Sequence, residues 1–266
     1  MKKEEFTMGK LDGKVCIITG CASGLGKQEA IRFAEEGAKL AICSRTAAKL
    51  EDTKRLCEER GAEVLAFPCD VSVAEQRVAF IDAVVKKYGT IDVLVNNAHN
   101  TTILKPMMEK TLEELEIETK CCLFAFFHFM QLCFPYMKDK PGAGASIINF
   151  ASKAAREGTP GHSVYATVKA GVGGLTRTAA REWGIHNIRV NELMPNGFTD
   201  NCKAGLELQP KEIQDWAAHS FKDNPFGRAG DPYADVAPVV VFLASDESHW
   251  ITGQNIHADG GVWITD

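Results

Sequence analysis

The 266-residue sequence predicts an α/β fold in which helices cover both faces of a doubly wound parallel sheet. The first observation behind this prediction is the alternation of short apolar runs with longer helical stretches, which implies parallel strands joined by right-handed crossovers. The second is a glycine-rich turn, TGCASGLG at residues 19–26, which separates the first apolar run from the first helical stretch. No linker-like segment interrupts the pattern, so we expect one domain over residues 1–266.

The composition excludes several classes of protein. The hydrophobic fraction of 45% supports a large core, and a net charge of −5 without a basic block argues against nucleic acid or an anionic membrane surface as a partner. The nine cysteines form no CxxC motif, which is typical of reduced thiols in a cytosolic protein. No Cys/His cluster has the spacing of a metal site. Residues 1–10 are charged and polar, so we expect a flexible tail and not a signal peptide.

Seven strands are expected, with helices between them. Apolar runs place these strands near residues 15–19, 39–43, 63–67, 91–95, 146–150, 188–192 and 254–258. The turn after the first strand carries Gly20, Gly24 and Gly26, which lets the backbone approach a pyrophosphate at the amino end of the next helix. This spacing differs from G-x-G-x-x-G, so the turn by itself is a weak indication of dinucleotide binding.

The end of the second strand bears on the choice of cofactor. An acidic residue normally stands here in folds that bind NAD, where it contacts the ribose hydroxyls. In this sequence Ser44 and Arg45 take that place. Serine leaves room for a 2′-phosphate and arginine can bind it, so the sequence favours NADP(H) over NAD(H). The alternative is that Arg45 only begins the next helix at the surface.

A long helical stretch is predicted over Glu109–Lys140, and its part from Cys121 to Phe134 is apolar almost all round. This apolar part is shorter than a membrane span, contains polar residues and ends at Pro135, so we do not expect it to cross a membrane. A helix that is apolar on all faces is buried on all faces. We therefore expect a second subunit to cover the face that the sheet does not, in a homodimer or homotetramer.

The segment from Ser152 to Lys169 holds the candidate catalytic residues. Tyr165 and Lys169 are four residues apart, which places them on one face of a helix. A phenol loses its proton only near pH 10, but a neighbouring ammonium favours the phenolate and suits the phenol to general acid/base catalysis. Ser152 follows the fifth strand, where ligands bind in open α/β sheets, and its hydroxyl could hold a substrate oxygen. The alternative is an ordinary surface pair of tyrosine and lysine.

Together, the TGxxxGxG turn and the Ser152, Tyr165 and Lys169 spacing resemble the short-chain dehydrogenase/reductase family. The resemblance covers nearly the whole chain and includes NNA at residues 96–98 and RVN at residues 189–191. It implies a Rossmann fold of seven strands in the order 3-2-1-4-5-6-7 and a dimer interface at the long apolar helix. It also implies that Tyr165 exchanges the hydroxyl proton, that Lys169 binds the nicotinamide ribose, and that Ser152 holds the substrate oxygen.

The same resemblance implies a cofactor site built from the glycine-rich turn, the ends of the second and third strands, and later loops. Its predicted residues are Gly20, Ser23, Gly24, Leu25, Gly26, Ser44, Arg45, Asp70, Val71, Asn97, Tyr165, Lys169, Pro195 and Phe198.

Three positions depart from the pattern of the family. Cys122 stands where the family has an asparagine that is thought to hold a water behind the lysine, and a thiol is a weak hydrogen-bonding group. If that water is lost, His99 is the first candidate for another proton route. His99 and Asn196 replace glycines near the expected nicotinamide position. We expect His99 to contact the substrate, the alternative being a solvated or structural histidine.

Residues 198–230 resemble the family least. Pro210 can start a short helix, whose apolar stripe would consist of Ile213, Trp216, Ala217 and Phe221. One interpretation is an amphipathic helix packed on the core. The other is a substrate lid over an apolar pocket, in which Trp216 contacts the substrate.

From these patterns we predict a cytoplasmic NADP(H)-dependent oxidoreductase that interconverts a secondary alcohol and a ketone on a small, largely apolar substrate. One alternative within the enzyme class is a 3-oxoacyl thioester reductase. Another, from a different class, is a nucleotide-binding sensor or regulator with little turnover. The identity of the substrate does not follow from the sequence, because the loops that shape such pockets vary.

Overall fold

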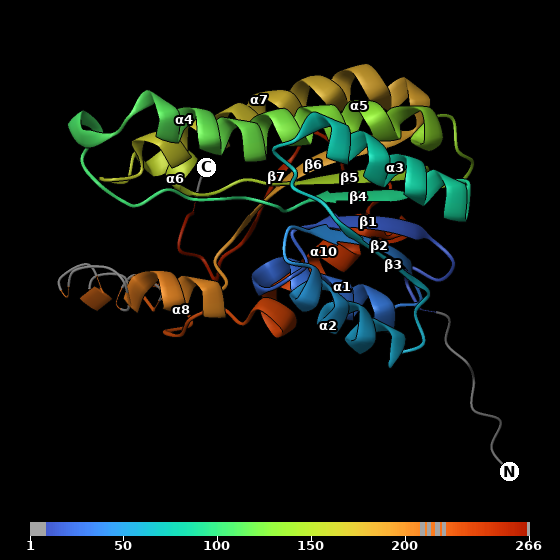
Figure 1. The fold of residues 1–266 in the computed structure, drawn as a ribbon, viewed down its shortest axis with the longest axis horizontal. Coiled ribbons are helices and arrows are strands. Elements are labelled where there is room, and N and C mark those ends of the chain that lie inside the picture. The colour runs from blue at the N-terminus through green and yellow to red at the C-terminus, as the bar shows by residue number, and fades with distance from the viewer. Residues whose placement is uncertain (1–8, 208–210, 212–213, 216–218, 220–221, 265–266) are drawn as a thin grey trace, which may run out of the picture.

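The computed structural model describes residues 9–207, 211, 214–215, 219 and 222–264. Its centre is a seven-stranded parallel sheet in the order β3-β2-β1-β4-β5-β6-β7, which confirms the predicted fold and strand order (Figure 1). The strands are β1 Val15–Thr19, β2 Lys39–Ser44, β3 Val64–Pro68, β4 Val93–Asn96, β5 Ala145–Phe150, β6 Ile188–Pro195 and β7 Asn255–Ala258.

The central strands are apolar because both of their faces are covered. All residues of β1, β4 and β5 are buried, as expected for a parallel sheet with helices on each side. Strand β4 begins two residues later than predicted, because the Asp92 carboxylate accepts a hydrogen bond from the Val15 N–H at 2.8 Å. Strand β6 is longer than predicted and reaches Pro195 at the edge where ligands bind.

One face of the sheet is covered by α1 Gly24–Glu35, α2 Ala47–Glu58 and α10 Ala237–Ala244, the last preceded by η4 Pro232–Val236 (Figure 1). Phe33, Leu50 and Leu243 are fully buried in the core beneath this layer. The helices thus turn their apolar stripes to the sheet, which is the pattern of an amphipathic surface helix.

The opposite face is covered by α3 Ala74–Tyr88, α4 Leu112–Thr119, α5 Ala125–Met137 and α7 Ser163–Trp183 (Figure 1). Phe80, Phe126 and Phe129 are fully buried in its core. The remaining described elements are short: η1 Met107–Glu109, η2 Lys120–Phe124, α6 Ala154–Glu157, η3 Gly184–His186, α8 Asp200–Glu207 and η5 Asp246–Ser248.

The long apolar helix differs in its bounds from the prediction. It begins at Leu112, because Thr111 and Glu114 form a capping box, and it runs through Pro135 to Met137. One turn, η2, is a π-helix. By length and composition the 26-residue helix Leu112–Met137 could cross a membrane, although 44% of its most apolar window is buried against the rest of the protein. The core helix of a globular protein passes the same test.

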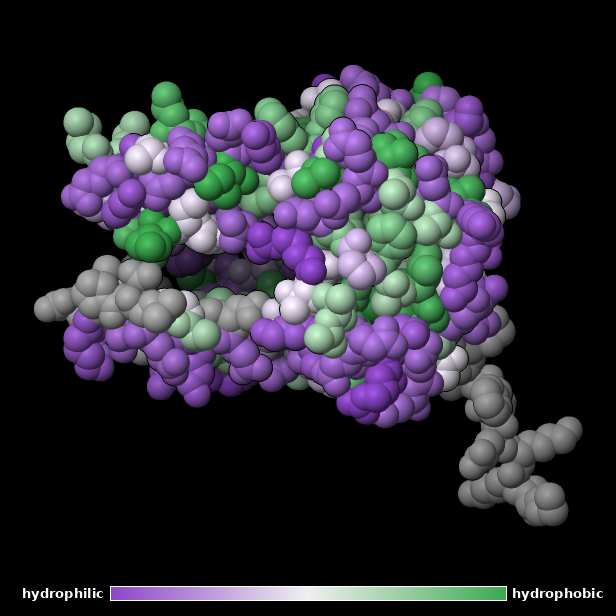
Figure 2. Space-filling view, viewed as in Figure 1, coloured by the Kyte–Doolittle hydropathy of each residue, from purple (hydrophilic) through white to green (hydrophobic). Residues whose placement is uncertain are grey.

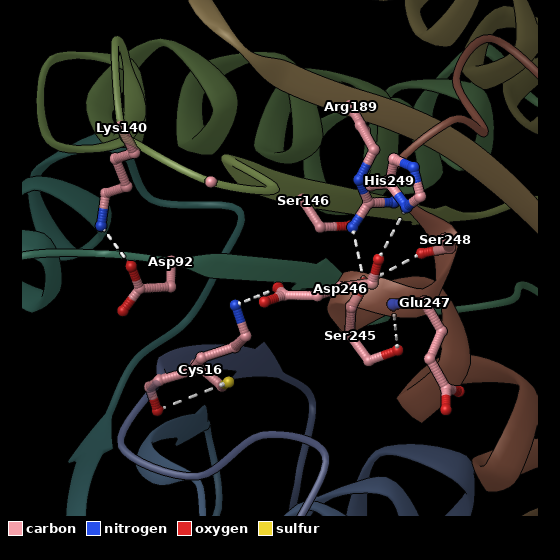
Figure 3. A network of polar contacts seen from close by, with 12 residues as sticks. Cys16, Asp92, Lys140, Ser146, Arg189, Ser245, Asp246, Glu247, Ser248 and His249 are labelled. Carbon is pink, nitrogen blue, oxygen red and sulfur yellow. Dashed lines mark hydrogen bonds and ion pairs between the residues drawn. The ribbon is translucent and has the colours of Figure 1, made fainter.

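The amino ends of the strands are held by a network of polar contacts (Figure 3). Asp92 binds the Lys140 ammonium, and the Arg189 guanidinium donates to the Ser245 carbonyl oxygen at 3.2 Å. The Ser248 hydroxyl donates to the same carbonyl at 3.1 Å. The edge of the sheet at the amino ends of the strands is therefore filled by the protein's own polar groups. A cavity lies at the opposite edge.

All nine cysteines are free, and eight of them are buried. Among the residues that the structure describes, no group of His, Cys, Asp or Glu side chains is arranged to hold a metal ion. The predicted apolar stripe falls on residues 213–221, most of which lie outside the described residues, and so does Trp216.

Candidate functional site

A cavity of about 610 Å³ lies at the carboxyl ends of the strands. Figure 2 shows the molecule hollowed on this face. Most of the predicted site residues line it: Gly20, Ser23, Gly24, Leu25, Ser44, Arg45, Asp70, Val71, Asn97, His99, Tyr165, Lys169 and Pro195. The structure thus brings together segments that are far apart in the chain, at the edge where open α/β sheets bind ligands.

The glycine-rich turn has the backbone that its sequence predicts. Gly20 has a φ of +81°, and a Cβ there would lie 2.9 Å from the Ala98 Cα. At Gly26 a Cβ would lie 2.5 Å from the Asn97 Nδ2, which donates to the Thr19 carbonyl oxygen at 2.8 Å. Gly26 therefore permits close packing of α1 on the loop after β4. It does not line the cavity, and its contact with a cofactor stays a prediction.

The amino end of α1 opens into the cavity through Ser23, Gly24 and Leu25. The first turn of this 12-residue helix carries no acidic side chain. The helix dipole and the backbone N–H groups at such an end favour an anion. The turn and the helix together suit the pyrophosphate of a dinucleotide.

Two cations lie at the end of the cavity next to β2. Arg45 and Lys49 are exposed and line the cavity, and neither forms an ion pair within the described part of the chain. The nearby Lys27, by contrast, is paired with Asp52 at 2.7 Å. The unpaired guanidinium of Arg45 and ammonium of Lys49 therefore suit a phosphate group as ligand. The Asp70 carboxylate, which also lines the cavity, accepts from the Ser72 N–H at 2.9 Å.

Tyr165 and Lys169 lie one turn apart on α7 and face the same cavity. The Lys169 ammonium is 5.9 Å from the centroid of the Tyr165 ring. Its side chain is buried, and its Nζ donates to the Phe150 carbonyl oxygen at 2.7 Å, at the end of β5. A fixed ammonium beside a phenol is the arrangement that general acid/base catalysis by the phenol requires.

Besides Gly26, two predicted site residues do not line the cavity. The Ser152 hydroxyl accepts a hydrogen bond from the Ala154 N–H at 3.2 Å, and Ser152 does not line the cavity. Phe198 also does not line it, and its N–H donates to the Gly230 carbonyl oxygen at 2.9 Å. The roles of Ser152 and Phe198 stay predictions, as does that of Trp216.

Cys122 lies close to Lys169, and its place at the asparagine position of the family stays a prediction. The residue is fully buried on the π-helical turn η2. Burial raises the pKa of its thiol, and the neighbouring Lys169 ammonium acts in the opposite direction. A protonated thiol at this place offers only weak hydrogen bonding.

His99 packs against the catalytic candidate. Its ring meets that of Tyr165 edge to face, with 5.0 Å between the centroids. Burial and the charge of Lys169 lower the pKa of His99 to about 4, although Glu118 acts to raise it. The imidazole is therefore neutral at pH 7. Neither His99 nor Asn196 has a positive φ, so neither strains the backbone where the family has glycine.

Glu118 is the residue of this region that sequence reasoning missed. It is fully buried on α4, and its Oε2 lies 3.5 Å from the His99 Nε2. An acidic residue four positions before Cys122, in a stretch that turns apolar, was a signal that could have identified it. Other lining residues that were not predicted include Lys49, Cys69, Asn100, Ile117, Lys120, Cys121, Gly197, Thr199 and Cys202.

Comparison with known proteins extends these observations. A family model described as enoyl-(acyl carrier protein) reductase matches residues 20–263. The chain is 37% identical over 262 residues to the 12α-hydroxysteroid dehydrogenase of Clostridium sp. strain ATCC 29733, covering 96% of this chain and 98% of that protein. It is 39% identical over 258 residues to the 3-oxoacyl-acyl-carrier-protein reductase FabG of Thermotoga maritima, covering 96% and 100%.

The fold is also similar to solved structures. One is a 7α-hydroxysteroid dehydrogenase in complex with NADH and 7-oxo glycochenodeoxycholic acid, with a TM-score of 0.85 and 32% identity. The match covers 94% of each chain.

Proposed function

This chain belongs to the short-chain dehydrogenase/reductase family and is an oxidoreductase that acts on CH–OH or carbonyl groups, and we propose a more specific reaction on this basis. It interconverts a secondary alcohol and a ketone on a small, largely apolar substrate, with NADP(H) as the cofactor. The observation that carries this proposal is the pair of Tyr165 and Lys169 in one cavity with the glycine-rich turn.

The protein's own residues bind the reactants and transfer the proton. When bound, the nicotinamide supplies or takes the hydride. Tyr165 gives the hydroxyl proton to the substrate oxygen or takes it back. Lys169 favours the phenolate and holds the ribose, and Ser152 holds the substrate oxygen. The buried position of Lys169, tied to Phe150, keeps its charge near the phenol without rearrangement.

A cofactor-oxidation screen tests the proposal. Purified protein is mixed with NADPH or NADH and with steroid ketones, cyclic ketones or 3-oxoacyl thioesters, and the loss of absorbance of the reduced cofactor is followed. Turnover of a steroid or cyclic ketone supports the proposal. Tight binding of NADPH without turnover of any ketone would instead favour the alternative of a sensor or regulator.

The second candidate, a 3-oxoacyl thioester reductase, rests on the FabG relative of Thermotoga maritima and on the description of the matching family model. The thioester arm of the screen distinguishes it. A kcat/KM that is highest for the thioesters would make this the main activity.

The preference for NADP(H) rests on Arg45 and Lys49. Both line the end of the cavity next to β2, and neither forms an ion pair within the described part of the chain. Arg45→Ala is expected to raise the KM for NADPH about ten- to a hundredfold and to change the KM for NADH little. A charge-assisted hydrogen bond to a phosphate contributes about 1.5–3 kcal/mol, and only NADPH carries that phosphate. Steady-state kinetics with each cofactor measure this.

The matched control is Arg55→Ala, because Arg55 is exposed on α2 and binds only surface carboxylates. It should leave both KM values unchanged. An equal rise for the two cofactors in Arg45→Ala would show that Arg45 does not meet the phosphate.

We propose that α5 and the turn before it form a subunit interface in a homodimer or homotetramer. Phe124 and Phe127 lie on this mostly apolar segment and are 55% and 49% exposed in the single chain. Light scattering at micromolar concentration should give a mass at least twice that of the chain, and Phe124→Asp with Phe127→Asp should reduce it. A monomeric wild-type protein would contradict the proposal.

We further propose that the chain is a single cytoplasmic domain in which the described part of residues 198–230 covers the substrate. Support comes from Thr199 and Cys202, which line the cavity where this segment begins. The eight buried free cysteines agree with a reducing compartment.

A further inference from the structure

His99 and Glu118 form a buried pair of ionisable side chains in the wall of the cavity. The side chains are 13% and 1% exposed, and the His99 Nε2 lies 3.5 Å from the Glu118 Oε2. In the part of the chain that the structure describes, three atoms of this pair have no hydrogen-bond partner of good geometry. They are both ring nitrogens of His99 and the Oε2 of Glu118. Buried polar groups without partners cost free energy, so this pair calls for a functional explanation.

The Glu118 carboxylate is anchored from the other side. Its Oε1 accepts from the Thr102 N–H at 2.8 Å and from the Thr102 hydroxyl at 2.6 Å. The Lys110 ammonium donates to the same hydroxyl at 2.8 Å and lies 3.8 Å from the partly exposed Glu114. The Oε2 is thereby directed toward His99, and a chain of polar groups leads from the Oε1 toward the surface.

The charge states of the pair follow from its surroundings. Burial acts to raise the pKa of Glu118, but its contacts with His99 and Thr102 outweigh this and lower it. A neutral imidazole therefore stands beside a carboxylate at pH 7. The carboxylate favours the tautomer with hydrogen on Nε2, which leaves the Nδ1 lone pair to accept a proton.

Cys122 gives a reason why another proton route is needed. It lies close to Lys169, and its thiol cannot hold a water firmly. The Lys169 ammonium, moreover, is bound to the Phe150 carbonyl. His99, by contrast, contacts the Tyr165 ring directly.

Resting on the function proposed above, we propose that His99 exchanges a proton with Tyr165 and that Glu118 is the positioning residue for His99. During alcohol oxidation the Tyr165 O–H bond breaks and a bond from that proton to the His99 Nδ1 forms. At the same time the Nε2–H bond breaks and its proton goes to the Glu118 Oε2. The imidazole stays neutral, and the phenolate is restored. During ketone reduction the same protons move back.

Kinetics of His99→Gln and Glu118→Gln test this proposal. Each variant should lower kcat at least about tenfold while the KM values for substrate and cofactor stay within about threefold, because a step after binding is impaired. The solvent deuterium isotope effect on kcat should rise in both. The matched controls are His249→Gln and Glu247→Gln, whose side chains are exposed at the opposite edge of the sheet, and both should behave as wild type.

A double-mutant cycle gives a measurement that would not change if His99 had only a structural role. Cys122→Asn places an amide beside Lys169. In the wild-type background it should change kcat little, whereas in the His99→Gln background it should raise kcat severalfold. Equal effects in both backgrounds would show that the two routes are independent and would overturn the proposal.

The remaining outcomes separate this proposal from the proposed function. An active wild type with an inactive Tyr165→Phe variant, but with unaffected His99→Gln and Glu118→Gln variants, overturns the proton exchange alone. A wild type that turns over no ketone overturns both.

Nitrogen NMR of the imidazoles in the wild-type protein covers the case in which the variants do not fold. It should show His99 as the neutral tautomer with hydrogen on Nε2 at pH 7. A protonated ring, or hydrogen on Nδ1, overturns the proposal.

Discussion

Tyr165→Phe is expected to lower kcat to below a few per cent of the wild-type value while the affinity for NADPH stays nearly unchanged. The substitution removes only the transferable proton, and a positioned general acid or base contributes about 10²- to 10⁴-fold to a rate. The ring itself remains, so its contact with His99 and the shape of the cavity are kept. Steady-state kinetics combined with fluorescence titration of NADPH measure the two quantities separately.

Tyr136→Phe is the matched control, because Tyr136 lies at the end of α5 and does not line the cavity. It should retain the wild-type kcat. Should Tyr165→Phe keep more than a few per cent of kcat, the role assigned to Tyr165 is wrong, and loss of NADPH binding would show damage to the site instead.

Glu29→Gln is expected to stabilise the protein strongly at high pH. Glu29 lies on α1, is fully buried, and neither carboxylate oxygen has a hydrogen-bond partner among the described residues. Burial raises the pKa of this carboxyl from 4.5 to about 8. The folded protein therefore holds a proton that the unfolded chain releases above pH 4.5.

The sign follows from this difference in bound protons. The stabilisation by that proton is complete below about pH 4.5 and is lost as the pH rises through about 8. Above pH 8 a buried unpaired charge remains, and the loss is on the order of 5 kcal/mol, since each pH unit corresponds to about 1.4 kcal/mol. A neutral glutamine does not incur this loss.

Urea unfolding at pH 5 and at pH 9 measures the effect. Wild type and Glu29→Gln should have similar free energies of unfolding at pH 5, and the variant should be the more stable by several kcal/mol at pH 9. Glu51→Gln, at an exposed position of α2, should show no such pH dependence relative to wild type. A constant difference between Glu29→Gln and wild type at both pH values would mean that Glu29 does not keep its proton in the fold.

Local patterns in the sequence were enough to predict the sheet and the centre of the candidate site. Continuous apolar runs identify strands that are covered on both faces, and all seven appeared within a few residues of their predicted positions. Tyr165 and Lys169 could be paired because one helical turn relates them. The glycine-rich turn could be recognised for the same reason, since its conformation depends on a few adjacent residues.

Other features depended on the tertiary structure, because they join segments that are distant in sequence. Packing assigned Gly26 to a contact with Asn97, and it placed Ser152 off the cavity. It also brought Glu118 to His99, across 19 positions of the chain, by way of the helix that faces the loop after β4. Whether a side chain is buried, and which charge it meets there, is set by every element around it. The pairing of His99 with Glu118 and the buried, protonated carboxyl of Glu29 could therefore be seen only once the chain was folded.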